Sequence, residues 1–182
     1  MNSMSKGNWQ DEKNCGCRKE KEKREEEGTK VLLKCKSGTP ISLRSTATTG
    51  TPNTIATLTL NTSHFKNPCI KLEFAANINS STGVSESIIL DFQVFRLCRG
   101  ERVSTPIGPI WTFSRGPSTA VAITTDTFSF LVCDCDCDCD CGIDDCCTYS
   151  VVVTSRAAVA SALANITNPI LSALVVEQNN HC

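Results

Sequence analysis

Cysteine alternates with aspartate from Cys133 to Cys141, and Cys146 and Cys147 follow a few residues later. This short stretch holds seven of the thirteen cysteines in the chain. A hydrophobic core does not need so many thiols in one place, so they indicate disulfide or metal chemistry. The candidates for either chemistry are Cys133, Cys135, Cys137, Cys139, Cys141, Cys146 and Cys147.

The cysteine tract continues a β-like run from Thr127 to Val132. In an extended strand every cysteine would point to one face and every aspartate to the other. Thiols on one face would then lie about 6.6 Å apart along the strand, whereas a disulfide joins Cβ atoms about 3.5–4.5 Å apart. Facing residues on adjacent antiparallel strands come close enough to bond. We therefore expect disulfides across strands, some of them within a hairpin over residues 133–147 that turns at Gly142–Asp145.

Metal binding is the alternative for the same cysteines. Thiolates favour zinc, copper(I) or iron–sulfur centres. Structural zinc sites use Cys-x₂₋₄-Cys knuckles that bend around the ion, and strict alternation would splay the thiols instead. The aspartates between them lack the glycine-punctuated loop of a calcium site. We expect no cofactor, and we keep Zn or Cu(I) at the hairpin cysteines as the alternative.

Catalytic motifs are missing from the sequence. The histidines, His64 and His181, do not stand in a metalloenzyme spacing, and there is no phosphate-binding glycine loop or nucleophile elbow. We expect His64 to lie in a turn, no residue to be catalytic, and the protein not to be an enzyme.

The composition limits the remaining classes of function. A chain of 182 residues suits one domain with an appendage, and its formal net charge of −1 argues against nucleic-acid binding. We expect no membrane span and no secretory signal peptide. An odd number of cysteines leaves at least one free, metal-bound or linked to another molecule. Cysteine usage typical of disulfides, without an export signal, indicates oxidation after the producing cell lyses, or reduced thiols that bind metal in the cytosol.

Residues 1–30 form a polar arm that carries Cys15 and Cys17, and Cys182 ends the chain. These three cysteines are our candidates for disulfides between molecules. The arm is a solvated tether that could reach about 100 Å when extended. It carries basic residues beside its thiols, whereas residues 116–155 contain seven Asp and no Lys or Arg. Opposite charge would draw the arm of one subunit toward the tract of another.

Residues 31–182 have a β pattern throughout, with turn residues at short, regular intervals. The pattern predicts an all-β domain, an eight-stranded antiparallel jelly-roll-like β-sandwich preceded by the flexible arm. Arg96 interrupts the alternation of one strand, and a bulge near Phe95 would restore it. The expected strands are Val31–Lys36 with Ile41–Arg44, Ile55–Leu60, Ile70–Asn79, Ser87–Cys98, Ile110–Phe113, Ala120–Thr124, Thr127 into the tract, Thr148–Thr154 and Ile170–Val176.

Several blocks of the sequence resemble an uncharacterised cysteine-rich protein family of clostridial spore-formers, over most of Lys30 to Gln178. These blocks are Asn67–Phe74, Phe92–Cys98, Thr127–Phe130 and Cys146–Tyr149. The overall plan is also similar, more loosely, to the endospore appendage (Ena) fibre subunits of bacilli. Those are small jelly-roll proteins with a cysteine-bearing N-terminal connector, which stack by sheet augmentation and intersubunit disulfides.

The resemblance implies a structural subunit of a self-assembling, disulfide-cross-linked fibre on the spore surface or outside the cell. Cys15 and Cys17 would then be connector thiols. The partner would be the same protein, joined head-to-tail through the arm, with other spore-surface subunits as further partners. Such a protein is made in the mother cell without a signal peptide. Two alternatives remain open: a cysteine-rich metal-binding spore coat protein and a surface glycan-binding module.

Overall fold

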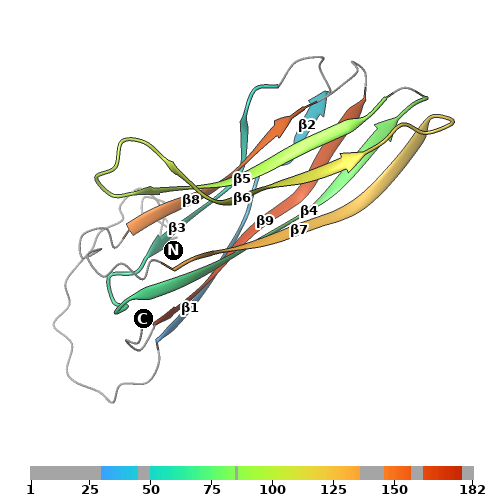
Figure 1. Ribbon diagram of the computed structural model, residues 1–182. Helices are drawn as coiled ribbons and strands as arrows, with labels where there is room; N and C mark the ends of the chain where they lie inside the picture. Colours follow the sequence, from blue (N-terminus) through green and yellow to red (C-terminus); the bar gives the residue numbers. More distant parts are fainter. Residues whose placement is uncertain (1–29, 45–49, 85, 136–145, 157–161, 178–182) are drawn as a thin grey trace, which may run out of the picture.

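The computed structural model describes residues 30–44, 50–84, 86–135, 146–156 and 162–177. These residues form nine strands and no helix, arranged as two antiparallel sheets packed face to face (Figure 1). Within these ranges there is accordingly no helix long and apolar enough to cross a membrane.

The two sheets follow the order of a jelly roll. Sheet A contains β1 (Val31–Ser37), β2 (Ile41–Arg44), β4 (Pro68–Thr82), β7 (Ala122–Asp134) and β9 (Leu163–Glu177). Sheet B contains β3 (Asn53–Asn61), β5 (Ile88–Cys98), β6 (Thr105–Arg115) and β8 (Cys146–Ser155). The orders are β1-β9-β4-β7, with β2 also on β9, and β3-β8-β5-β6. With β1 and β2 counted as one interrupted strand, the predicted eight-stranded jelly roll is confirmed.

Gly38 marks the interruption between β1 and β2. A Cβ at this position would lie 2.0 Å from the carbonyl oxygen of Ile55, so only glycine fits. Its backbone N–H donates to Pro169 at 2.7 Å, and the N–H of Thr39 donates to Ile55 at 2.8 Å. Because Pro169 lies in β9 and Ile55 in β3, this junction connects the two sheets.

The core lies between the sheets and follows the predicted alternation. In β4 the even-numbered side chains from Ile70 to Ser80 are buried, while their odd-numbered neighbours face outward. An aromatic cluster fills the centre: Phe92 lies 4.7 Å from Phe128, and Trp111 stacks on Phe130 at 4.3 Å between ring centroids. Burial of this inner face is the main stabilising contribution to the sandwich.

The predicted bulge near Phe95 is wrong. The pairing of β5 with β8 runs without a shift from Leu90 to Cys98, and Arg96 faces the inside of the sandwich. The irregularity lies instead in the pairing of β5 with β6, between Phe92 and Val94. There Gly108 has φ 67°, and the side-chain amide of Gln93 donates to the carbonyls of Ile107 and Gly108 at 3.1 and 3.2 Å.

Two predicted strands are one in the structure. The sequence separated Ala120–Thr124 from the strand that starts at Thr127, but β7 is continuous from Ala122 to Asp134. The strand continues through the polar residues at 124–127 because β7 stays paired with β4 there. Thr125 lies opposite Asn79 and donates a hydrogen bond to it at 2.7 Å. Asp126 is also held, by an ion pair with Arg115.

Candidate functional site at the cysteine-rich end of the sandwich

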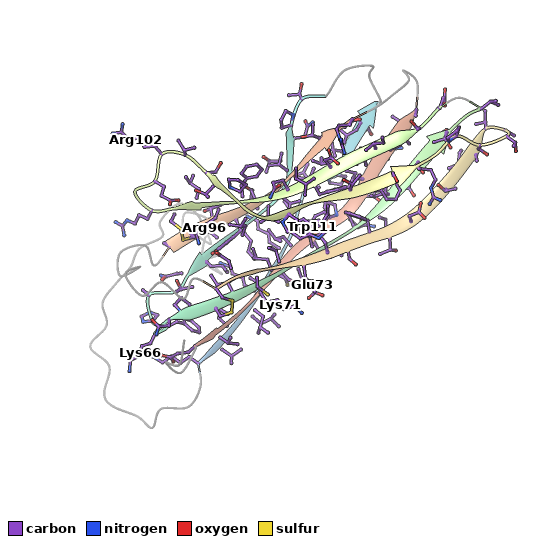
Figure 2. The ribbon with its side chains drawn as sticks, viewed as in Figure 1. Lys66, Lys71, Glu73, Arg96, Arg102 and Trp111 are labelled. Carbon is purple, nitrogen blue, oxygen red and sulfur yellow. A yellow bond between two sulfur atoms is a disulfide. The ribbon has the colours of Figure 1, made fainter. Side chains whose placement is uncertain are left out.

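Two disulfides between described cysteines lie at one end of the sandwich, one in each sheet. Cys98 at the end of β5 bonds to Cys147 at the start of β8, and Cys69 at the start of β4 bonds to Cys135, directly after β7. The end of β3 pairs with Cys146 and leads through residues 62–67 to the start of β4. Both disulfides therefore lie at the same end, which we call the cysteine-rich end (Figure 2).

Both disulfides join residues that face each other on neighbouring antiparallel strands. Cys98 and Cys147 are register partners with Cα atoms 3.9 Å apart. Cys69 and Cys135 continue the β4–β7 ladder one step beyond its last pair, with Cα atoms 4.3 Å apart. The expectation of bonding across strands is met for Cys135, because adjacent strands bring facing Cβ atoms within disulfide reach.

The predicted hairpin over residues 133–147 lies mostly outside the described residues, which include only 133–135 and 146–147 of it. The strands that flank it belong to different sheets, since β7 lies in sheet A and β8 in sheet B. Cys135 and Cys147 accordingly bond to Cys69 and Cys98, which lie far from the tract in sequence. Cys146 is also disulfide-bonded.

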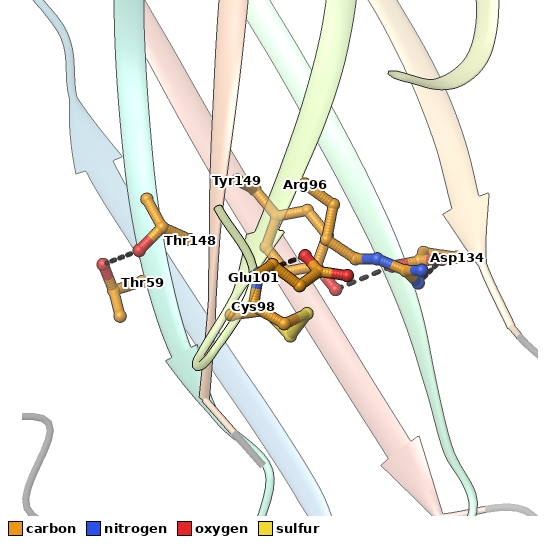
Figure 3. Close-up of a disulfide and its surroundings, with 8 residues drawn as sticks. Thr59, Arg96, Cys98, Glu101, Asp134, Thr148 and Tyr149 are labelled. Atoms are coloured by element: carbon orange, nitrogen blue, oxygen red, sulfur yellow. Dashed lines mark hydrogen bonds and ion pairs between the residues drawn. A yellow bond between two sulfur atoms is a disulfide. The ribbon is translucent and has the colours of Figure 1, made fainter. Parts of the chain in front are cut away.

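The turn after β5 is braced against the disulfide at Cys98 (Figure 3). The Glu101 carboxylate accepts a hydrogen bond from the backbone N–H of Cys98 at 2.7 Å, and the N–H of Glu101 donates to the carbonyl of Cys98 at 3.0 Å. The N–H of Arg99 donates to the carbonyl of Cys146 at 2.9 Å, which extends the β5–β8 ladder past the disulfide.

A buried polar cluster connects the two sheets beside this disulfide (Figure 3). Asp134 of β7 accepts from the guanidinium of Arg96 in β5 at 2.8 Å, and from the hydroxyl of Tyr149 in β8 at 2.7 Å. The Asp134 side chain is only 7% exposed, against 24% for Arg96. A buried carboxylate must be paired, and here each of its oxygens has a donor.

The start of the tract shows the predicted alternation. Cys133 is exposed, Asp134 is buried, and Cys135 lies on the same outer side of sheet A as Cys133. At this position the aspartate therefore points into the sandwich and the cysteines point outward. Cys133 is a free thiol, and so is the exposed Cys35 of β1.

The described chain begins and ends at the cysteine-rich end. The N–H of Glu177 donates to the carbonyl of Lys30 at 3.2 Å, and its carboxylate accepts from the N–H of Lys66 at 2.9 Å. The Lys30 ammonium donates to the carbonyl of His64 at 2.9 Å. His64 lies in a turn, as predicted.

The remaining predicted sites lie outside the described residues: Cys15, Cys17, Cys137, Cys139, Cys141, His181, Cys182 and the turn at 142–145. Within the described ranges, no group of three or more His, Cys, Asp or Glu side chains is placed to hold a metal ion.

Four residues that take part in the disulfides, the free thiols or the buried ion pair described above were not identified from the sequence. Cys69 and Cys98 are isolated in sequence, and only the pairing of distant strands brings them to Cys135 and Cys147. Cys35 drew no attention as a lone cysteine in an edge strand. Arg96 was taken as an irregularity, although its inward position in an otherwise apolar alternation was a signal that it needs a buried anion.

These features define a disulfide-bonded jelly-roll domain. The chain belongs to the DUF4489 family, described as a domain of unknown function, whose pattern matches residues 29–176. No curated protein matches the sequence. A β-sandwich held by disulfides is consistent with a structural protein.

Solved structures with some similarity come from infectious bursal disease virus. The Gx strain structure is 10% identical with a TM-score of 0.26, and the match covers 81% of this chain and 39% of that chain. The VP2 subviral particle is 9% identical with a TM-score of 0.24, covering 80% and 40%. The chain thus spans about two fifths of the length of these viral chains.

Proposed function

We propose that this protein is the structural subunit of a self-assembling, disulfide-cross-linked fibre or appendage on the spore surface. One observation carries the proposal. Five of the seven described cysteines are in disulfides, and the two that remain free, Cys35 and Cys133, are both exposed on the outside of the sandwich. Exposed thiols on a domain that is otherwise oxidised are available for bonds to other molecules.

The fold supports assembly through its edges. β1 and β7 end the sheet A path, and β3 and β6 end sheet B, so each presents backbone groups on one side. Such edges can accept a strand from a neighbouring chain. A head-to-tail contact of this kind uses two different surfaces and propagates as a filament.

The N-terminal arm would connect subunits along the filament. It joins the domain at Lys30, at the cysteine-rich end, and its reach of about 100 Å exceeds the size of one domain. Cys15 and Cys17 would bond to further cysteines in the cysteine tract of the next subunit, toward which opposite charge draws the arm. The spore location rests on the family resemblance: the chain is made reduced in the mother cell and oxidises after lysis.

The test is the double change Cys15→Ser with Cys17→Ser in the full chain. We expect wild-type assemblies, seen by electron microscopy, to withstand hot detergent without reductant. The variant assemblies should break down to small species of one or two subunits, because the subunits lack the covalent connection along the filament. The control is Asn8→Ser with Asn14→Ser, which alters the arm equally and keeps both thiols. Unchanged resistance in the cysteine variant would reject arm locking.

A further inference from the structure

The outer face of sheet A carries an exposed apolar area on the half nearest the cysteine-rich end. Its large apolar side chains are between 37% and 73% exposed. We call this area the outer patch, and it consists of Val31, Leu33, Leu131, Ile170 and Leu174 with the free thiols Cys35 and Cys133. Exposed apolar side chains gathered on one face, together with free thiols, indicate a contact surface.

The pairing registers place five of these residues in two neighbouring rows across four strands, with Val31 and Ile170 in the rows on either side. One row runs Leu33, Leu174, Lys71, Cys133, and the next runs Cys35, Ser172, Glu73, Leu131. Residues in one row point to the same side of the sheet. Figure 2 shows Lys71 and Glu73 directed away from the sandwich, whereas Trp111 lies between the sheets.

The two free thiols of one molecule are too far apart to bond to each other. Cys35 lies on β1 and Cys133 on β7, at opposite ends of the sheet A path. Three strand spacings separate them by roughly 14 Å, whereas a disulfide requires Cα atoms within about 7 Å.

We propose that the outer patch binds the outer patch of a second copy of this chain, face to face, with Cys35 of each copy bonded to Cys133 of the other. The inference deepens the proposed function and rests on its premise that the chain associates with itself. The two copies would be related by a two-fold axis that lies between their facing A sheets and runs parallel to the strands. This symmetry places β1 of one copy opposite β7 of its partner. Face-to-face sheets are commonly rotated by about 30°, and the proposed contact takes the sense of rotation that reduces the offset of one row between the two thiols.

The charges of the patch favour a second copy of this chain over a partner whose surface is uniformly positive or uniformly negative. Lys71 and Glu73 stand side by side in its centre, with side chains 44% and 59% exposed, and their charged atoms are 4.0 Å apart. The patch is therefore locally neutral. A two-fold related copy brings each lysine within side-chain reach of the partner's glutamate, so both charges gain a second counter-ion at the interface.

The area of the patch explains why the contact needs covalent bonds. Four strands and about four rows cover on the order of 500 Å². Stable complexes bury about 800 Å² per partner, so apolar contact alone would give weak, transient pairs. Weak pairing is sufficient to align the thiols, and the disulfides then make the contact permanent.

The oxidant is a low-molecular-weight disulfide. The thiolate of Cys35 attacks one of its sulfurs and releases one thiol, which leaves a mixed disulfide on Cys35. The thiolate of the partner's Cys133 then attacks the Cys35 sulfur, and a second small thiol leaves. Each new protein disulfide thus reduces one small disulfide to two thiols.

The experiment mixes equal amounts of ¹⁴N- and ¹⁵N-labelled full-length protein with oxidised glutathione, followed by proteolysis without reductant and mass spectrometry. We expect a linked peptide pair containing Cys35 and Cys133, about half of it with one light and one heavy partner. Absence of that pair, or its presence only as light–light and heavy–heavy species, would overturn the proposal.

Matched variants test the surface itself. Leu131→Lys should lower the yield of the hybrid linked pair at least tenfold, because it places a charge in the patch. Ile123→Lys is the control, since Ile123 is 80% exposed on the same strand but lies outside the patch. Equal yields from the two variants would contradict the proposed interface.

The Cys15→Ser, Cys17→Ser variant separates this inference from the arm mechanism. Here the hybrid Cys35–Cys133 pair should persist even where the fibres fall apart. Loss of the pair in this variant would show that the contact depends on the arm, which contradicts the proposal.

Discussion

At the scale of single residues, Asp134 shows how one side chain connects the chemistry of the tract to the fold. It lies between Cys133, a free thiol, and Cys135, which is bonded to Cys69. Its own side chain turns inward to Arg96 and Tyr149 in the opposite sheet. Because neighbouring side chains in a strand point to opposite faces, the buried ion pair of Asp134 also holds Cys133 and Cys135 on the outer face.

We predict that Asp134→Asn lowers the free energy of unfolding by about 2–3 kcal/mol. The change leaves the mostly buried Arg96 without its counter-charge, and the quarter of that side chain that remains exposed moderates the cost. Glu73→Gln is the control, because Glu73 and its partner Lys71 are 59% and 44% exposed and surface pairs contribute at most about 1 kcal/mol. Urea unfolding of both variants measures the difference, and equal losses would contradict the role of the buried pair.

At the scale of elements, the interrupted first strand sets how the two sheets meet. β1 and β2 both pair with β9, and the chain between them passes within hydrogen-bond distance of β3. Only a residue without a side chain fits there. The Gly-Thr-Pro sequence indicated a turn, but the close approach to Ile55 depends on a strand that follows later in the chain.

We predict that Gly38→Ala destabilises the domain by about 1–3 kcal/mol, because the added methyl group must displace the backbone of Ile55. Gly116→Ala serves as the control, since a Cβ there meets nothing within 4 Å. The shift in thermal unfolding midpoint measures both. A Gly38→Ala domain as stable as the control would show that the β1–β2 junction can move away without cost.

At the scale of the whole molecule, the Cys69–Cys135 and Cys98–Cys147 disulfides close large loops in a sandwich whose strands pair mainly with partners distant in sequence. The bonded cysteines are 66 and 49 residues apart in sequence. Bonds of this span restrict the unfolded chain strongly, and they secure the end where the described chain starts and finishes.

We predict that removing either disulfide, by Cys69→Ala with Cys135→Ala or by Cys98→Ala with Cys147→Ala, costs about 2–5 kcal/mol. The control is Cys35→Ala with Cys133→Ala, which removes two exposed free thiols and should change the monomer's stability by less than about 0.5 kcal/mol. Denaturant unfolding at low protein concentration tests all three. A control as unstable as the disulfide variants would mean that the free thiols have a structural role within the monomer.

The sequence by itself determined the fold class, most strand positions and the alternation of Cys133 and Asp134 at the start of the tract. These depend on the period of two in a strand and on turn residues, which are local properties. Only the tertiary structure decided that Cys135 bonds to Cys69 and Cys147 to Cys98, that β7 and β8 separate into different sheets, and that Arg96 points inward. Each of these depends on which distant strands become neighbours, and that choice is made by burial of the whole inner face.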